Sequence, residues 1–182
     1  MRPERFKPFF EKLSKEMTAS LISRDLSSCE KCFEIEDNLP IFDVLDLLEK
    51  HECLRLENGQ VITRDDTMRK PVKTLFYLLI TEIEYRLYKV LKNRVESLEK
   101  LRESEFNELI RLFLENKELF EIQDIYSKRA ELKEDLKAIS SFRNVIMHAP
   151  RKIDLETRYD VVVKRKNQAL KLMKMLGEIY FK

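Results

Sequence analysis

The sequence has no tryptophan, 2 glycines and 5 prolines among its 182 residues. So few turn-forming residues argue against an all-β fold and favour long helices. No uncharged apolar run reaches the about 18 residues that a membrane-spanning helix needs. The first six residues, MRPERF, are too charged to lead into the core of a signal peptide. We therefore expect a cytoplasmic protein with no membrane partner.

Cysteine is also scarce. The chain has three cysteines, and an odd, small number of this kind does not form a disulfide framework. Cys29 and Cys32 form a C-x-x-C pair, which supplies half of a structural zinc site. Cys53 and His51 would have to complete the four ligands through the fold. We expect thiols in a reducing compartment, and no metal site.

Charge is abundant but unevenly distributed. Charged residues make up 37% of the chain, apolar residues 43%, and the net charge is +2. Residues 143–182 hold 10 Lys and Arg against 4 Asp and Glu, which gives +6, while the preceding 142 residues hold 25 against 29, which gives −4. This basic segment fits either a polyanionic partner or a solvated helix face.

The N-terminal part predicts a helix followed by a small α/β unit. An amphipathic helix over about 3–22 precedes a short strand over 32–35, a helix ending near Lys50 and a strand over 53–56. Asn58-Gly59, a strong hairpin signal, connects that strand to the next, over 61–63. The predicted order is βαββ.

From Pro71 onward the spacing of apolar residues is helical. It predicts a helix of about 30 residues and three further helices, over about 104–116, 127–148 and 157–180. Successive helices of this kind favour an antiparallel bundle. On the third helix an apolar stripe surrounds Arg143, and its members are Leu132, Leu136, Ile139, Ile146 and Met147.

Arg143, Asn144 and His148 stand at the end of this helix, just before Pro150. The pattern resembles the Arg-x4-His signature of the HEPN superfamily, whose members include metal-independent endoribonucleases and non-catalytic binding modules. The resemblance implies RNA as substrate and an active site formed across a homodimer. Arg143 would bind the phosphate and His148 would act in acid–base catalysis, with Asn144 and Glu84 in support.

Two other interpretations of these residues stay open. The pair of Arg143 with Glu84 (or with nearby Glu82) is also what a plain ion pair between two helices would use. The bundle would then be a non-catalytic dimerisation or nucleotide-binding module. A toxin-type subunit held by a separate antitoxin protein is the remaining alternative.

The βαββ segment is similar to a single CBS motif, on the helix 42–48 and on Thr63-x-x-Asp66. In that family these positions contact the phosphate and ribose of an adenine nucleotide, which would here be a regulatory ligand. The other interpretation is that Thr63 and Asp66 cap the following helix. The predicted fold is α+β, mostly α, with a CBS-like unit over 1–70 and a HEPN-like bundle over 71–182.

Overall fold

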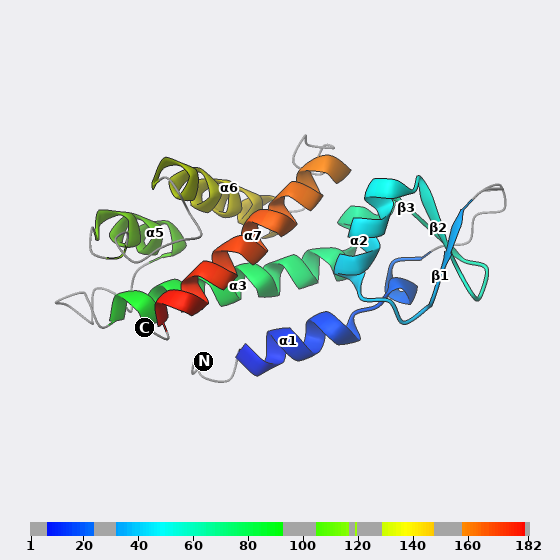
Figure 1. Cartoon of the computed structure of the whole chain (residues 1–182), viewed down its shortest axis with the longest axis horizontal. Helices are drawn as coiled ribbons and strands as arrows, with labels where there is room; N and C mark the ends of the chain where they lie inside the picture. Colours follow the sequence, from blue (N-terminus) through cyan, green and yellow to red (C-terminus); the bar gives the residue numbers. More distant parts are fainter. Residues whose placement is uncertain are drawn as a thin grey trace. The chain divides into compact units, whose positions relative to one another are not determined.

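The computed structural model describes residues 7–23, 32–92, 105–116, 119, 129–147 and 158–180 (Figure 1). It is mostly helical with one three-stranded sheet, which confirms the predicted α+β class. The chain divides into two compact units. The first comprises Met1–Leu78 and Ala149–Lys166, and the second Leu79–His148 and Asn167–Lys182.

This division differs from the predicted one into 1–70 and 71–182. Two helices, α3 (Lys70–Lys92) and α7 (Tyr159–Tyr180), each contribute residues to both units. The first turns of α3, to Leu78, and the first turns of α7, to Lys166, belong to the first unit. The helical periodicity of the sequence does not reveal this, because it does not indicate which partner each half of a helix packs against.

The sheet of the first unit has the predicted βαββ order. The strands β1 (Phe33–Ile35) and β2 (Cys53–Leu56) pair in parallel, with α2 (Ile41–Lys50) as their crossover. The strand β3 (Val61–Thr63) pairs with β2 antiparallel through a tight turn, so β2 is central and β1 is an edge strand. Gly59 adopts φ 84° in this turn, a conformation that glycine adopts without steric cost.

Two side chains from outside α2, Tyr159 and Arg64, donate hydrogen bonds to backbone carbonyl groups of α2. The Tyr159 hydroxyl donates to the Leu45 carbonyl at 2.6 Å, and Arg64 Nε donates to the Leu48 carbonyl at 3.1 Å. The Arg64 guanidinium also lies over the Tyr159 ring, 5.1 Å from its centroid. Leu48 O is one of the carbonyls that the end of a helix leaves without an intrahelical partner, so this bond caps α2.

Lys166 makes the next contact along α7. Its side chain is 2% exposed, and its ammonium group pairs with the carboxylate of Asp46 on α2. A buried ammonium is costly unless it is paired, so this contact fixes α7 on α2 within the first unit. Together with the Tyr159 hydrogen bond, it explains why the first turns of α7 belong to this unit.

The N-terminal helix ends earlier than predicted. The sequence pattern predicts a helix to about residue 22, but α1 (Lys7–Glu16) stops before a β-bridge between Thr18 and Pro40. A 3₁₀ turn, η2 (Ala19–Leu21), follows. The backbone after Glu16 thus pairs with the loop before α2 instead of extending the helix.

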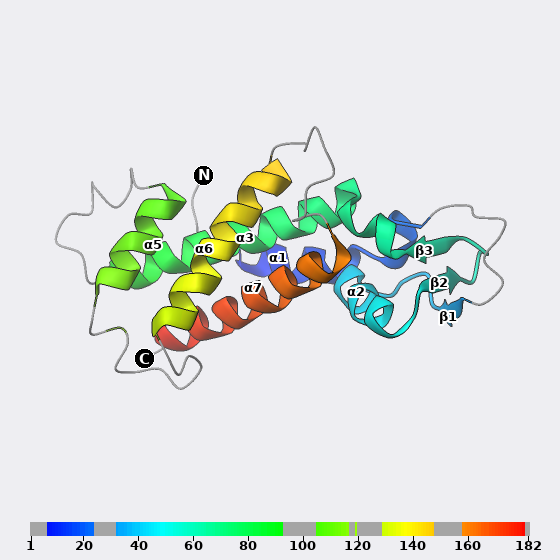
Figure 2. The same cartoon turned by 90° about the horizontal axis from the view of Figure 1, so that it is seen from above.

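The second unit consists of the C-terminal part of α3, α5 (Phe106–Glu115), α6 (Arg129–Met147) and the C-terminal part of α7 (Figure 2). Contacts between α6 and α7 run in opposite directions along the two helices, because Glu131 pairs with Lys171 while Asp135 accepts a hydrogen bond from Gln168. These two helices are therefore antiparallel. The predicted continuation of α3 beyond Lys92, to about residue 101, lies outside the described residues.

The core of the second unit is formed by apolar residues of α5, α6 and α7. Its members from α5 and α6 are buried, and they are Phe106, Leu109, Ile110, Phe113, Leu132, Leu136, Ile139 and Phe142. On this part of α7 the buried residues are Ala169, Leu172, Met175, Leu176 and Ile179.

Candidate functional site

Arg143 on α6 lies between α3 and α5 in the second unit. Its guanidinium pairs with the Glu84 carboxylate of α3 at 3.4 Å. It also lies over the Phe106 ring of α5, 5.7 Å from the centroid. The Arg143 side chain is 35% exposed and Glu84 is 27% exposed, so the pair is half-buried and solvent reaches it. A partner that enters from solvent can therefore reach the guanidinium.

Glu84 is the carboxylate that reaches Arg143, whereas Glu82 points to another partner. Glu82 is 2% exposed and pairs with Arg86 at 2.7 Å. Arg86 in turn donates a hydrogen bond to the Met173 carbonyl of α7 at 2.7 Å. Residues two apart on a helix lie on nearly opposite faces, so α3 uses one carboxylate toward α7 and the other toward α6.

Two opposing effects set the pKa of Glu84. Burial raises the pKa of this carboxyl above its ordinary value of 4.5, and the positive charge of Arg143 lowers it by a smaller amount. The net shift is upward, because the arginine does not fully replace the hydration that the carboxylate has lost. The carboxyl is therefore easier to protonate than one on the surface.

The apolar stripe of α6 differs from the predicted one at its C-terminal end. Leu132, Leu136 and Ile139 are fully buried, as predicted, but Met147 is 52% exposed. Phe142 is buried in its place. The core-facing side of α6 is thus rotated, and Arg143 lies at the edge of the apolar face.

The remaining residues of the predicted site are only partly described. Asn144 is exposed on α6, next to Arg143. His148 lies outside the described residues, so its role stays a prediction. Phe106 was not singled out from the sequence. Its place as the first residue of a helix after Glu105 was visible, but its contact with Arg143 depends on how α5 packs.

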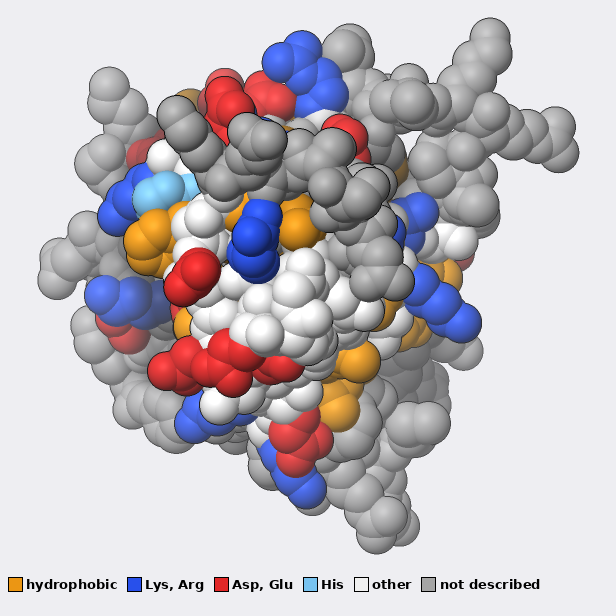
Figure 3. Space-filling view, turned by 90° about the vertical axis from the view of Figure 1, so that its right-hand side faces the viewer, with side chains coloured by type: hydrophobic (Ala, Val, Ile, Leu, Met, Phe, Trp, Pro, Cys, Tyr) orange, Lys and Arg blue, Asp and Glu red, His pale blue; other side chains and the backbone are white. Residues whose placement is uncertain are grey.

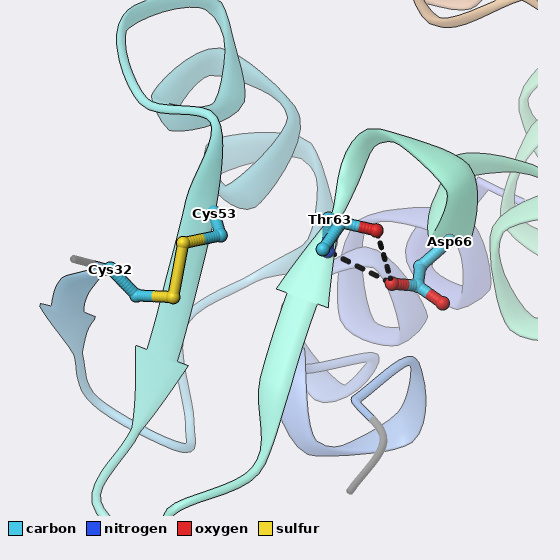
Figure 4. Close-up of a disulfide and its surroundings, with 4 residues drawn as sticks. All are labelled: Cys32, Cys53, Thr63 and Asp66. Atoms are coloured by element: carbon cyan, nitrogen blue, oxygen red, sulfur yellow. Dashed lines mark hydrogen bonds between the residues drawn. A yellow bond between two sulfur atoms is a disulfide. The ribbon is translucent and has the colours of Figure 1, made fainter. Parts of the chain in front are cut away.

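Thr63 and Asp66 form a capping box at the start of η3 (Arg64–Met68). Asp66 Oδ2 accepts hydrogen bonds from the Thr63 amide at 2.8 Å and from the Thr63 hydroxyl at 3.1 Å (Figure 4). Its Oδ1 pairs with Arg69 Nε at 2.8 Å, and the Asp66 side chain is 1% exposed. The bond from the Thr63 amide to Oδ2 is the one that the capping interpretation requires, and both carboxylate oxygens have protein partners. Nucleotide contacts by this pair stay a prediction.

Cys32 and Cys53 form a disulfide (Figure 4), which corrects the expectation that they are thiols. The register of β1 and β2, with Phe33 opposite Leu54, places the two cysteines directly across from each other. The C-x-x-C spacing of Cys29 and Cys32 suggested only half of a zinc site and no disulfide. Sequence spacing does not contain the register of two parallel strands, because that register depends on the crossover between them.

Within the described part of the chain, no group of three or more His, Cys, Asp or Glu side chains is arranged to hold a metal ion. No helix there is long and apolar enough to span a membrane. Comparisons of the chain with family models, curated proteins and solved structures find no match.

Proposed function

We propose that this protein is a metal-independent endoribonuclease that cleaves single-stranded RNA at a site formed by Arg143 and His148. The observation that supports this most is the half-buried pair of Arg143 and Glu84. A guanidinium has five N–H donors in a planar fork, and one carboxylate contact at 3.4 Å leaves donors for a phosphate. Glu84 and Phe106 would hold the group in a fixed orientation.

Cleavage without a metal requires cationic charge on the phosphate and groups that transfer protons. Arg143 would supply the charge, and His148 would take or give the proton, because imidazole titrates near neutral pH. Asn144, exposed beside Arg143, would donate to a phosphate oxygen. One Arg and one His are a minimal set, so the site would be completed by the same residues of a second protomer in a homodimer.

The exposed face of α6 fits a strand of RNA. Lys133 and Lys137 are exposed and stand four residues apart, which places both on one side of the helix. On the same side of α6 lies Asn144. Of the acidic residues in this part of α6, Glu131 and Asp135 contact α7, and Glu134 is exposed. This arrangement leaves positive charge available for backbone phosphates.

A non-catalytic role is the second candidate, because Arg143 already has the partner that a structural ion pair would have. The bundle would then be a dimerisation or RNA-binding module. In either case an antitoxin-like partner could mask the same face.

The test is cleavage of a mixed single-stranded RNA pool in EDTA by wild type, His148→Ala and Arg143→Gln. His51→Ala is the matched control, since His51 is the only other histidine. We expect cutting by wild type and by His51→Ala, and loss of cutting in the other two variants while they stay folded. Parallel reactions with an added adenine nucleotide test whether nucleotide binding at Thr63 and Asp66 changes the rate of RNA cleavage. RNA binding without cutting by any protein would instead support the binding module.

A further inference from the structure

The edge strand β1 pairs with β2 along its three residues but buries little apolar surface. It has three residues, and only Ile35, at 8% exposed, is buried. Phe33 is 47% exposed, and its ring stacks on His51 with a centroid separation of 4.2 Å. Burial of so little apolar surface stabilises the position of β1 weakly, because the hydrophobic effect scales with the area removed from water.

The opposite strand of the sheet is held differently. Val61 and Ile62 of β3 are 1% and 0% exposed, and a tight turn connects β3 directly to β2. The connection from β1 to β2, by contrast, passes through the whole of α2. A crosslink between β1 and β2 therefore matters for β1 and not for β3.

The Cys32–Cys53 disulfide is that crosslink, and its position makes it accessible from one side. Cys53 is 4% exposed, whereas Cys32 is half-buried at the start of β1. The face of the first unit that carries the sheet is seen in Figure 3, where charged and apolar side chains share the surface. A small thiol can thus approach the Cys32 sulfur more easily than the Cys53 sulfur.

We infer that Cys32 and Cys53 form a reversible thiol–disulfide site, which exchanges with small thiols and disulfides of the glutathione class and controls the attachment of β1. In reduction, a thiolate attacks Cys32 Sγ, and Cys53 leaves as a thiolate that takes up a proton. A second thiol then attacks the mixed disulfide. Two small thiols are oxidised to one disulfide, and the protein gains two thiols. Oxidation by a small disulfide runs the same steps in reverse.

The experiment uses the full chain, equilibrated with glutathione disulfide or with dithiothreitol. Disulfide mapping by mass spectrometry identifies the bonded cysteines, and hydrogen exchange follows the amides of β1 with β3 as the internal reference. We expect a Cys32–Cys53 bond in the oxidised protein. Reduction should speed exchange in β1 about 10-fold or more with little change in β3.

Two variants separate the site from general effects of reduction. Cys29→Ser keeps both bonded cysteines and should keep the response of β1. Cys32→Ser removes the bond at its more exposed end and should show fast β1 exchange in both conditions. A bond between Cys29 and Cys32, no bond at all, or β1 exchange that does not change on reduction would each overturn the inference.

Discussion

Asp66 in the first unit and Glu84 in the second unit each pair with an arginine, but in different surroundings. Asp66 is 1% exposed and lies 2.8 Å from Arg69. Its other oxygen accepts two hydrogen bonds from Thr63. Glu84 is 27% exposed and lies 3.4 Å from Arg143. Both oxygens of the Asp66 carboxylate have close protein partners. The Glu84–Arg143 pair is longer and more exposed, so an incoming anion can compete for Arg143.

The largest effect on stability should come from a substitution of Asp66, whose carboxylate is buried and fully hydrogen-bonded. Asp66→Asn removes the charge that holds Arg69 and places amide donors beside the Thr63 amide. We expect the free energy of unfolding to fall by about 2–3 kcal/mol, because hydrogen bonds to a buried charged group are lost. Urea denaturation measures this change.

The control for that variant is Asp65→Asn, at the exposed neighbouring position of η3. It should change stability by no more than about 0.5 kcal/mol, as surface substitutions usually do. If both variants lost the same free energy of unfolding, the loss would come from the change in net charge and not from the contacts of Asp66.

Breaking the Arg143–Glu84 pair should change the free energy of unfolding less than Asp66→Asn does, and should mainly change the pKa of Glu84. Arg143→Gln removes the charge that lowers the pKa of Glu84, so we expect this pKa to rise further above its ordinary value. The stability loss should be about 1 kcal/mol or less, because the pair is partly exposed. Carboxyl NMR titration follows the Glu84 resonance.

Arg111→Gln is the matched control for this titration. Arg111 is an exposed arginine of the same unit, and it pairs with Glu108 and Glu115 of its own helix. Its replacement should leave the Glu84 titration unchanged. An unaltered Glu84 pKa in Arg143→Gln would show that the two groups do not interact in solution.

The pH dependence of stability follows from the same shift. Because the pKa of Glu84 is higher in the folded protein than in the unfolded chain, the folded state binds its proton more tightly. This contribution is fully present below the unfolded pKa and is lost as pH rises through the folded pKa. Glu84→Gln lacks it, so the stability of wild type relative to Glu84→Gln should decrease across that window. Thermal or urea unfolding at successive pH values checks this, and an increase would contradict it.

The smallest expected effect concerns the outer face of α6. Replacing both Lys133 and Lys137 with Gln should weaken binding of single-stranded RNA a few-fold and reduce the slope of log K against log salt by about 1.4, or 0.7 per lost phosphate contact. Lys174→Gln, an exposed lysine on α7, is the control. If the double variant has the same slope as wild type, Lys133 and Lys137 do not contact RNA phosphates.

Local patterns of the sequence predicted the elements better than their partners. Alternation and the Asn58-Gly59 turn predicted the βαββ order, because a hairpin is specified by neighbouring residues. The end of α1 was predicted too late, since it depends on a bridge between Thr18 and Pro40, which are far apart in the chain. The Cys32–Cys53 bond depends in the same way on strand register.

The candidate site shows the same limit. The pattern around Arg143 and the position of Glu84 pointed to a pair between two helices, and the structure brings these two residues together. The Phe106 ring beside Arg143 could not be anticipated, because α5 reaches α6 only through tertiary packing. The rotation of α6 that exposes Met147 has the same origin.

The proposed function requires that the Arg143 guanidinium bind a phosphate of single-stranded RNA. The most direct measurement compares RNA affinity of His148→Ala with that of the double variant His148→Ala, Arg143→Gln, so that no cutting confuses the result. We expect Kd to rise about 10-fold or more in the double variant, because a charge-assisted hydrogen bond is lost. An unchanged Kd in a folded double variant would contradict it and leave Arg143 as a structural partner of Glu84.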